Sequence, residues 1–383
     1  MHDDGTGGPI GHLYVHVPFC PTICPFCSFH VLRRRDDLVA VYLDRLDAEL
    51  ADLARRWPER GALHTVYLGG GTPSQLTDGE LERLLGSIRR RFDVTADAEI
   101  GIEVHPLDVG PGRPRRWAEL GFRRVSVGVQ STQDPVLRTL GRPHDAATAL
   151  RAVDDVLAAG LPTVNADLIV AVPGQDVAAD LDRLAATGVT HLAAYTLTIE
   201  DGTPFARRGV AVDEAAEAAA LRLAGEVLSA RGLHRYEVSN HARPGHECAH
   251  NLGYWRGRCW FGVGPSATAL LPGPDGSRLL ARNPTFDDWV AGAPPDVEGL
   301  DPLELARTRL LTGLRLAEGL DEAALWALCP SAAVDPTVVD HFDGLRARID
   351  ALCGTGRLWR AGGRLGAHQS ELVVLDRLLA ALW

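Results

Sequence analysis

The sequence has no excess of positive charge and no long apolar run. Its 39 Lys and Arg residues are outnumbered by 50 Asp and Glu residues, which gives a formal net charge of −11. This balance does not favour nonspecific binding to nucleic acid or to anionic membranes. No segment approaches the roughly 18–20 apolar residues of a membrane-spanning helix, and the first ten residues lack the apolar core of a signal peptide. We therefore expect a soluble cytoplasmic protein with no nucleic-acid partner and no membrane span.

Cysteine is also scarce, and its number is odd. Seven cysteines in 383 residues are too few for a disulfide-stabilised scaffold. Three of them, Cys20, Cys24 and Cys27, lie close together in the sequence, and the other four are scattered. The cysteines therefore indicate a local site rather than a network of disulfides.

The first 230 residues alternate short β-like runs with amphipathic helical segments. The six predicted strands are His12–Val17, Thr65–Leu68, Glu99–Val104, Arg124–Val129, Thr163–Val170 and Leu192–Leu197. The clearest predicted helices are Leu38–Arg56, Asp78–Arg91 and Ala146–Ala159, with Asp78 as the expected N-cap of the second. Such a series requires parallel strands joined by crossover helices, either in a (β/α) barrel or in an open, doubly wound sheet.

Polar or glycine-rich segments follow the predicted strands or lie near their ends. In a barrel these segments lie at one mouth, where barrel enzymes carry their active sites, whereas an open sheet concentrates function at one switch point. We therefore predict an α/β protein with a partial (β/α)6 TIM-like barrel. The predicted domains are the barrel in residues 1–231, a covering or connecting segment in residues 232–292, and a small, mainly helical C-terminal domain in residues 293–383.

The three clustered cysteines form the pattern C-x3-C-x2-C directly after the first predicted strand. Burial as small apolar side chains is one interpretation, but two prolines in the same loop make it poor core material. A zinc site would need a fourth ligand, for which His30 is the nearest candidate. A [4Fe–4S] cluster fits better, because thiolates are its usual ligands and three of them leave one iron free to bind another molecule.

The cysteine spacing resembles that of radical S-adenosylmethionine (SAM) enzymes, and further motifs narrow the resemblance. These motifs are Tyr14–Cys20 (YVHVPFC), Gly69–Pro73 (GGGTP), Glu103–Pro106 (EVHP), Ser126–Ser131 (SVGVQS), Asp167–Ile169 (DLI), Pro173–Gln175 (PGQ) and His250–Trp255 (HNLGYW). Together they resemble the oxygen-independent coproporphyrinogen III oxidase-like family over residues 12–270. In radical SAM enzymes the amino and carboxylate groups of SAM bind the open iron, and an electron from the cluster cleaves SAM to a 5′-deoxyadenosyl radical.

The resemblance assigns roles to individual residues of this sequence. It implies a [4Fe–4S] cluster held by the three cysteines and a SAM molecule bound by Tyr14, Phe26, Gly70, Gly71, Thr72 and Glu103. Gln130, Arg142 and Asp167 match residues that contact a second SAM in the coproporphyrinogen enzyme. An Arg side chain can bind a carboxylate through two hydrogen bonds. The alternative for Arg142 and Asp167 is a purely structural ion pair, because a carboxylate in an apolar strand needs a partner.

Departures from the family's common patterns guide the choice of function. The coproporphyrinogen enzyme usually has another cysteine where this sequence has Phe29. The heme chaperone usually has an acidic residue at Ser28 and reads Glu-Ala-Asn-Pro in place of Glu103–Pro106. An altered lining on a SAM-binding scaffold predicts a new substrate. We therefore expect an enzyme that uses two SAM molecules to methylate or cyclopropanate an sp2 carbon of a natural-product intermediate. A heme chaperone-like role is the alternative. The resemblance also implies a small-molecule substrate and a reductant such as flavodoxin or ferredoxin.

Overall fold

The computed structural model describes residues 10–274, 277–329 and 336–382. The first nine residues, on which most of the signal-peptide argument rests, lie outside the described residues. Along the described chain, no helix combines the length and the apolar character that are needed to cross a bilayer.

Within the described residues, the largest sheet has nine strands. Their order across the sheet is β11 (Phe261–Val263), β1 (His12–Val17), β4 (Leu63–Gly70), β5 (Val94–Val104), β6 (Arg124–Gln130), β7 (Thr163–Val170), β8 (His191–Thr196), β10 (Asn240–Ala242) and β9 (His234–Arg235). The strands from β11 to β8 are parallel, and β10 and β9 form an antiparallel edge. From β1 to β8, neighbours in the sheet follow one another along the chain, as in a barrel. The predicted partial (β/α)6 barrel is therefore confirmed, and the doubly wound alternative is wrong.

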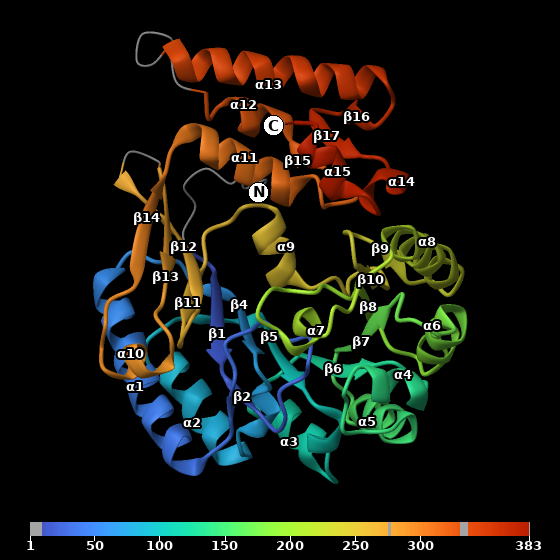
Figure 1. Cartoon of the computed structure of the whole chain (residues 1–383). Helices are drawn as coiled ribbons and strands as arrows, with labels where there is room; N and C mark the ends of the chain where they lie inside the picture. The colour runs from blue at the N-terminus through green and yellow to red at the C-terminus, as the bar shows by residue number, and fades with distance from the viewer. Residues whose placement is uncertain (1–9, 275–276, 330–335, 383) are drawn as a thin grey trace.

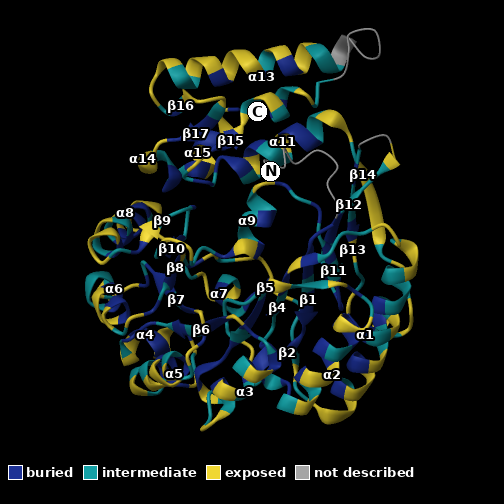
Figure 2. Cartoon of the chain, turned by 180° about the vertical axis from the view of Figure 1, so that it is seen from behind, coloured by how far each residue is buried: buried dark blue, intermediate teal, exposed yellow. Residues whose placement is uncertain are grey.

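Helices surround this sheet on its outer face, so that the buried strands lie inside a ring of helices with exposed outer surfaces (Figures 1 and 2). The helices of the barrel are α1 (Asp36–Arg56), α2 (Asp78–Arg89), α3 (Arg113–Leu120), α4 (Asp134–Thr139), α5 (Ala146–Ala158), α6 (Val177–Ala186), α7 (Pro204–Arg207) and α8 (Glu214–Ala230). Two 3-10 turns, η1 (Pro73–Gln75) and η2 (Pro106–Asp108), follow β4 and β5. A short parallel pair, β2 (Phe19–Cys20) and β3 (Leu32–Arg33), follows β1.

Local sequence explains where these helices begin and which face they bury. Helix α1 buries apolar residues at spacings of three and four, including Val39, Leu43 and Leu46, against the sheet. Helix α2 begins with a capping box in which the Thr77 side chain accepts from the Glu80 N–H and the Glu80 carboxylate accepts from the Thr77 N–H. The prediction that Asp78 caps this helix was therefore wrong by one residue, because the Asp78 backbone is already helical.

The segment predicted to cover the barrel also completes its sheet. Residues 232–292 supply β9 and β10 at one edge and β11 at the other. They continue with β12 (Thr268–Pro272) and β13 (Arg278–Arg282), which form a three-stranded antiparallel sheet with β14 (Asp296–Leu300), and with α10 (Phe286–Val290). Strand β14 lies after the predicted boundary at residue 293, but it pairs with β13, which lies before that boundary. The domain boundaries stay a prediction.

Helix α9 (Ala249–Trp255) closes the end of the barrel at which the strands begin. The His250 ring contacts the Thr65 hydroxyl on β4, with 2.7 Å between Nδ1 and Oγ1. The His250 N–H donates to the Glu99 carboxylate on β5 at 3.3 Å, and His250 Nε2 lies 2.7 Å from the Tyr254 hydroxyl. Helix α9 therefore forms the floor of the barrel.

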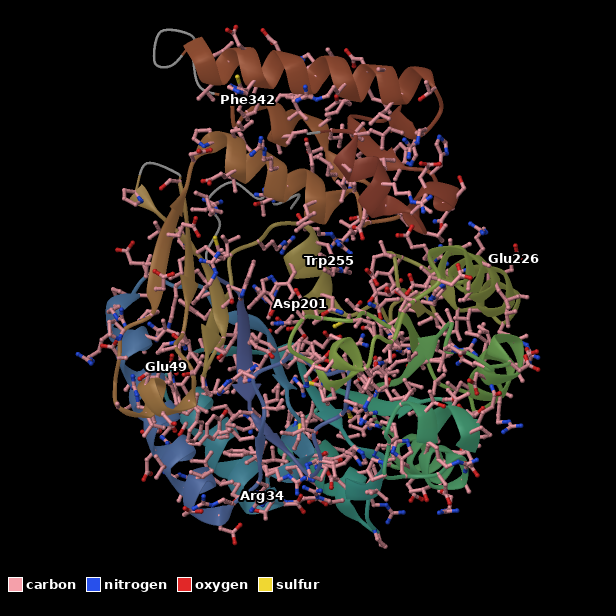
Figure 3. All side chains as sticks on the ribbon, viewed as in Figure 1. Arg34, Glu49, Asp201, Glu226, Trp255 and Phe342 are labelled. Carbon is pink, nitrogen blue, oxygen red and sulfur yellow. The ribbon has the colours of Figure 1, made fainter. Side chains whose placement is uncertain are left out.

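The C-terminal domain lies beside α9, on the side of the barrel away from β2 (Figure 1). It contains α11 (Pro302–Gly313), β15 (Leu320–Asp321), α12 (Glu322–Trp326), α13 (Pro336–Gly354), β16 (Leu358–Ala361), β17 (Arg364–Ala367), α14 (Gln369–Leu372) and α15 (Leu375–Ala380). The Arg315 guanidinium lies 5.3 Å from the centre of the Trp255 ring, at the contact between this domain and α9 (Figure 3). The predicted mainly helical C-terminal domain is confirmed, with a small antiparallel sheet added to it.

Candidate functional site

The cysteine loop, residues 20–31, leaves β1 at the end of the barrel opposite α9. Its entry is fixed by the Leu32 N–H, which donates to the Pro18 carbonyl at 2.7 Å, and by a turn in which the Cys27 N–H donates to the Cys24 carbonyl at 3.1 Å. None of Cys20, Cys24 and Cys27 is in a disulfide. The loop therefore presents three unpaired thiols at the mouth of the barrel.

The glycine-rich segment after β4 packs directly against the chain that leads into this loop. A Cβ atom on Gly71 would lie 2.7 Å from the Val17 carbonyl oxygen, and a Cβ on Gly70, whose φ is +103°, would lie 2.3 Å from the His16 ring. Only glycine permits such an approach. The Thr72 hydroxyl then reaches Cys20, with 3.4 Å between Oγ1 and Sγ. The predicted SAM-binding segment and the first cysteine are therefore in contact.

A cavity of about 590 Å³ lies between the cysteine loop and the ends of the strands. All the predicted cluster and SAM residues except Tyr14 line it: Cys20, Cys24, Phe26, Cys27, Gly70, Gly71, Thr72, Glu103, Gln130, Arg142 and Asp167. Their convergence follows from the parallel strands, whose carboxyl ends meet at one mouth. Asn251 at the start of α9 lines the same cavity, which therefore extends to the barrel floor.

Glu103 is a half-buried carboxylate that lines the cavity. It accepts a hydrogen bond from the Gly70 N–H at 3.2 Å and one from the Tyr67 hydroxyl. Burial and the nearby Asp167 carboxylate raise the pKa of Glu103 to about 7. Because a positive charge would relieve both effects, this position favours a cationic group such as an ammonium or a sulfonium.

Asp167 is held by Ser126 on the adjoining strand β6 and by Asn165 on its own strand, β7. The Ser126 hydroxyl lies 3.1 and 3.0 Å from its two carboxylate oxygens, and the Asn165 amide donates at 2.7 Å. Burial raises the pKa of Asp167 to about 6, although these hydrogen bonds oppose the rise. Asn165 in turn contacts His191, with 2.6 Å between Oδ1 and Nδ1. The Asp167 carboxylate is therefore fixed by a polar network.

Arg142 faces the cysteine loop and has no carboxylate in contact with it among the described residues. Its guanidinium donates to the Cys24 sulfur at 3.1 Å and to the Gly128 carbonyl at 3.2 Å. Its Nε atom is buried and has no hydrogen-bond partner within the described chain. The structural Arg142–Asp167 ion pair is absent from the salt bridges of the described residues, so the arginine is available to an anionic ligand.

Tyr14 does not line the cavity. Its hydroxyl lies 3.2 Å from His16 Nδ1, and its ring lies 6.4 Å from the ring of His250 on α9. Sequence reasoning placed Tyr14 by its distance from the first cysteine, which does not show that α9 packs beside it. The contact of the Tyr14 backbone or ring with SAM stays a prediction.

Sequence reasoning gave no role to Tyr67, Ser126 or Asn165, which orient the two cavity carboxylates. For Ser126 and Asn165, the spacing along the strand could have indicated this role. Ser126 precedes Gln130 by four residues and Asn165 precedes Asp167 by two, so each lies on the same face of its strand as a predicted ligand-binding residue. Tyr67 carried no such signal, because its role depends on β4 lying beside β5.

The three cysteines fit the ligand set of an iron–sulfur cluster. All three thiols face one cavity, and burial raises the pKa of the Cys20 thiol to about 11 and also raises that of Cys27, as expected for thiols whose ionised form needs a cation. No group of three His, Cys, Asp or Glu side chains in the described residues is arranged for a single metal ion. His30 instead accepts from the Phe286 N–H at 3.1 Å, so it is not placed as a zinc ligand beside the cysteines.

Comparisons with known proteins agree with this arrangement. Residues 14–185 match the radical SAM superfamily. The heme chaperone HemW of Mycobacterium tuberculosis (strain ATCC 25618 / H37Rv) is 38% identical over 371 residues, which cover 92% of this chain and 93% of that protein. The heme chaperone HemW of Escherichia coli (strain K12) is 36% identical over 282 residues, covering 71% and 73% of the two chains.

A solved structure shows the same fold. Coproporphyrinogen III oxidase (HemN) from Escherichia coli, described as a radical SAM enzyme, superimposes with a TM-score of 0.81 at 22% identity. The superposition covers 98% of this chain and 90% of that chain. It includes the C-terminal domain as well as the barrel, so the similarity extends over the whole architecture.

These relatives correct the function expected from the sequence. The prediction of a methyltransferase or cyclopropanase is wrong, because relatives that match most of this chain at 36–38% identity are heme chaperones. The departures at Ser28, Phe29 and His105 predicted a new substrate. They occur, however, in a chain whose sequence is otherwise similar to those of the heme chaperones. The chain belongs to the radical SAM superfamily and, within it, to the coproporphyrinogen III oxidase-like family that includes the heme chaperone HemW.

Proposed function

We propose that this protein is a heme chaperone that carries a [4Fe–4S] cluster and SAM. The observation that carries the proposal is the 38% identity to a heme chaperone over 93% of that protein's length. The cavity supports it, because the predicted cluster and SAM residues converge there while its mouth stays open to a further ligand. Heme is then the small molecule that the protein carries.

The mouth of the cavity offers apolar side chains to a flat apolar ligand. Phe29 is 68% exposed and Ile23 49%, and both lie on the cysteine loop and line the cavity. Large apolar side chains gathered at one opening are typical of binding sites. We propose that the porphyrin ring packs against this apolar rim, defined as Ile23 and Phe29.

The interior of the cavity supplies the groups that a cluster and SAM require. Cys20, Cys24 and Cys27 would hold the cluster, which when bound supplies the single electron for reductive cleavage of SAM. Gly70, Gly71 and Thr72 would bind the amino-acid end of SAM along their backbone, with Glu103 facing its positive charge. Phe26, whose ring lies 6.1 Å from that of Phe205, would pack against the adenine. A flavodoxin or ferredoxin is the proposed electron donor.

A further set of cavity residues has the groups for a second SAM. Arg142 would bind a carboxylate, and the Asp167 carboxylate would face an ammonium group, with Gln130 between them. Gln130 has a φ of +67° where β6 ends, a conformation that a non-glycine residue adopts at a cost. This conformation belongs to the irregular pairing of β6 with β7, and it brings Gln130 to the cavity lining.

Heme binding by the purified protein tests the proposed function. The anaerobically reconstituted protein should keep about one heme per chain through gel filtration, with a shifted Soret band. Phe29→Ser should weaken heme affinity about tenfold, since burying a Phe side chain contributes roughly 1.5–3 kcal/mol. Val297→Ser is the matched control, because Val297 is 52% exposed on β14 and does not line the cavity.

The two variants separate specific from adventitious binding. Loss of affinity in Phe29→Ser alone would support the apolar rim as the heme site. Equal affinities for both variants and the unaltered protein would show that heme binds elsewhere. A protein that passes gel filtration without heme would contradict the chaperone function itself.

A further inference from the structure

Three buried nitrogen atoms without partners belong to Arg142 and to two histidines close enough for its charge to lower their pKa values. They are Nε of Arg142, Nε2 of His105 and Nδ1 of His144, none of which has a hydrogen-bond partner within the described residues. The two rings are edge-on to one another, 5.1 Å apart, and their side chains belong to residues that are only 5% and 4% exposed. An unsatisfied buried polar group costs about 1–3 kcal/mol. The two unpartnered atoms on residues that line the cavity, those of Arg142 and His105, therefore indicate a missing ligand.

The position of His105 is fixed by its own backbone and by the turn that follows it. Its N–H donates to the Ser74 hydroxyl at 3.0 Å, and its carbonyl accepts from the Asp108 N–H at 2.9 Å. Its Nδ1 atom accepts from the Leu107 N–H at 3.2 Å, which makes His105 the N-cap of η2. The ring is therefore held with Nε2 as its free atom.

The protonation of each ring follows from these contacts. Because Nδ1 of His105 accepts a hydrogen bond, the neutral ring carries its proton on Nε2, which is therefore a donor. Burial, together with the nearby Arg142 and His144, lowers the pKa of His105 to about 3, so the ring is neutral at physiological pH. His144 has the opposite tautomer, since its Nε2 lies 3.1 Å from the Val129 carbonyl and must donate, leaving Nδ1 as an acceptor.

We propose that His105 binds the carboxylate of the second SAM together with Arg142, as a second hydrogen-bond donor that fixes the orientation of that carboxylate. This inference rests on the proposed SAM site at Arg142. His105 lines the cavity, whereas His144 does not. Gly128 leaves space beside them, because a Cβ there would lie 3.2 Å from Gln130 Nε2 and 3.6 Å from Arg142 Nη2.

Charge in the cavity favours an amino-acid group over other anions. Arg142 and His105 offer N–H groups at one side, while Glu103 and Asp167 place two carboxylates in the same cavity. A phosphate dianion would be repelled by these carboxylates. A zwitterionic amino-acid end satisfies both sides, with its carboxylate at Arg142 and His105 and its ammonium toward the acids.

Two substitutions at His105 separate the proposed Nε2 hydrogen bond to SAM from the Nδ1 hydrogen bond that caps η2. His105→Asn keeps a side-chain oxygen near the position of Nδ1, which accepts from the Leu107 N–H, but it removes the Nε2 donor. His105→Gln has the reverse effect, because its amide nitrogen reaches the position of Nε2. We expect His105→Asn to bind SAM about tenfold more weakly and His105→Gln to stay within about threefold, since a hydrogen bond to a charged group is worth roughly 1.5–3 kcal/mol.

The measurement is equilibrium binding of SAM to the cluster-loaded protein, resolved into the first and the second equivalent bound, with decarboxylated SAM as a second probe. The affinity compared between variants is that of the second equivalent, which occupies the proposed Arg142 site. If His105 contacts the carboxylate, His105→Asn will weaken SAM but will bind decarboxylated SAM as the unaltered protein does. His144→Gln is the matched control, because it keeps a donor to the Val129 carbonyl and should leave both affinities unchanged. Melting temperatures of all variants check the fold.

The outcomes distinguish this inference from the site on which it rests. Normal SAM affinity in His105→Asn, with a large loss in Arg142→Ala, would overturn the role of His105 and leave the carboxylate site in place. Normal SAM affinity in both variants would refute the carboxylate site. Equal weakening of SAM and decarboxylated SAM by His105→Asn would also overturn the inference, because the histidine would then act on another part of the ligand.

Discussion

Replacing Glu103 by Gln should make the protein more stable at high pH while weakening its affinity for SAM. In the folded protein the pKa of Glu103 is about 7, against the ordinary value of 4.5. The folded state therefore keeps a proton that the unfolded chain has already released. Stability conferred by this group is present at low pH and is lost as the pH rises from about 4.5 through 7.

The magnitude follows from the size of that difference. A shift of about 2.5 pH units corresponds to roughly 3 kcal/mol at 1.36 kcal/mol per unit. Because the Glu103 side chain is partly open to the cavity, solvent screening reduces this effect, and we expect a change of about 1–2 kcal/mol. Glu103→Gln has no ionisable group there, so its free energy of unfolding should exceed that of the unaltered protein increasingly from pH 5 to pH 8.

Urea unfolding of the SAM-free protein at pH 5, 6.5 and 8 measures this difference. Glu226→Gln is the control, since Glu226 is an exposed carboxylate on α8 (Figure 3). The difference between the unaltered protein and Glu103→Gln should grow with pH, and that for Glu226→Gln should stay constant. Parallel pH dependences for the unaltered protein and Glu103→Gln would show that the Glu103 carboxylate does not keep a proton in the folded state.

Two further predictions concern the cysteine loop and the turn after β11. Replacing all three cysteines of the loop by Ala should abolish bound iron and sulfide, whereas Cys353→Ala in α13 should leave both unchanged; a full cluster in the triple variant would disprove the ligand assignment. Ser266→Gly should raise the free energy of unfolding by about 1 kcal/mol, because Ser266 has a φ of +58°, where glycine has no steric penalty. An unchanged or lower urea midpoint would show that this turn is not strained.

Regular periodicity in the sequence was enough to predict the barrel. The predicted strands His12–Val17 and Thr163–Val170 match β1 and β7 residue for residue. Each of the three predicted helices matches α1, α2 or α5 at one end and differs by one or two residues at the other. These elements are long, and each has one apolar face that is visible within a short window. Their order along the chain then determines their order in the sheet, because consecutive parallel units pack side by side.

What the sequence did not predict depends on contacts between distant segments. Strand β11 has three residues and no periodicity of its own, and it joins the sheet because β1 has a free edge. Helix α9 forms the floor of the barrel through His250, which sequence analysis placed only within a motif. The packing of α9 also explains why Tyr14 faces a neighbouring ring instead of the cavity.

The sequence predicted the site residues that belong to a motif at the end of a strand. It did not predict the residues whose role depends on contact with another residue of the site. Glycine and cysteine positions were recognisable because close backbone approach and metal ligation each require one residue type. In the sequence, His105 is only a departure from a common pattern. Its Nε2 atom is left as the free ring nitrogen because Nδ1 accepts from the Leu107 N–H in η2, a contact that the sequence does not show. Asn165 and Ser126 act through Asp167, so their roles follow from the packing of β6 beside β7.

The pairing of β11 with β1 has a consequence for the synthesis of the protein. The cysteine loop leaves the ribosome before β11, so the edge of β1 stays without its partner until residues 261–263 have emerged. At about 5–20 residues per second, this interval lasts roughly 10–50 s. The thiols are then carried on an incomplete sheet and exposed to oxidants. Iron and sulfide should therefore be incorporated after translation has passed β11, and pulse-labelled chains truncated before residue 261 should not retain iron.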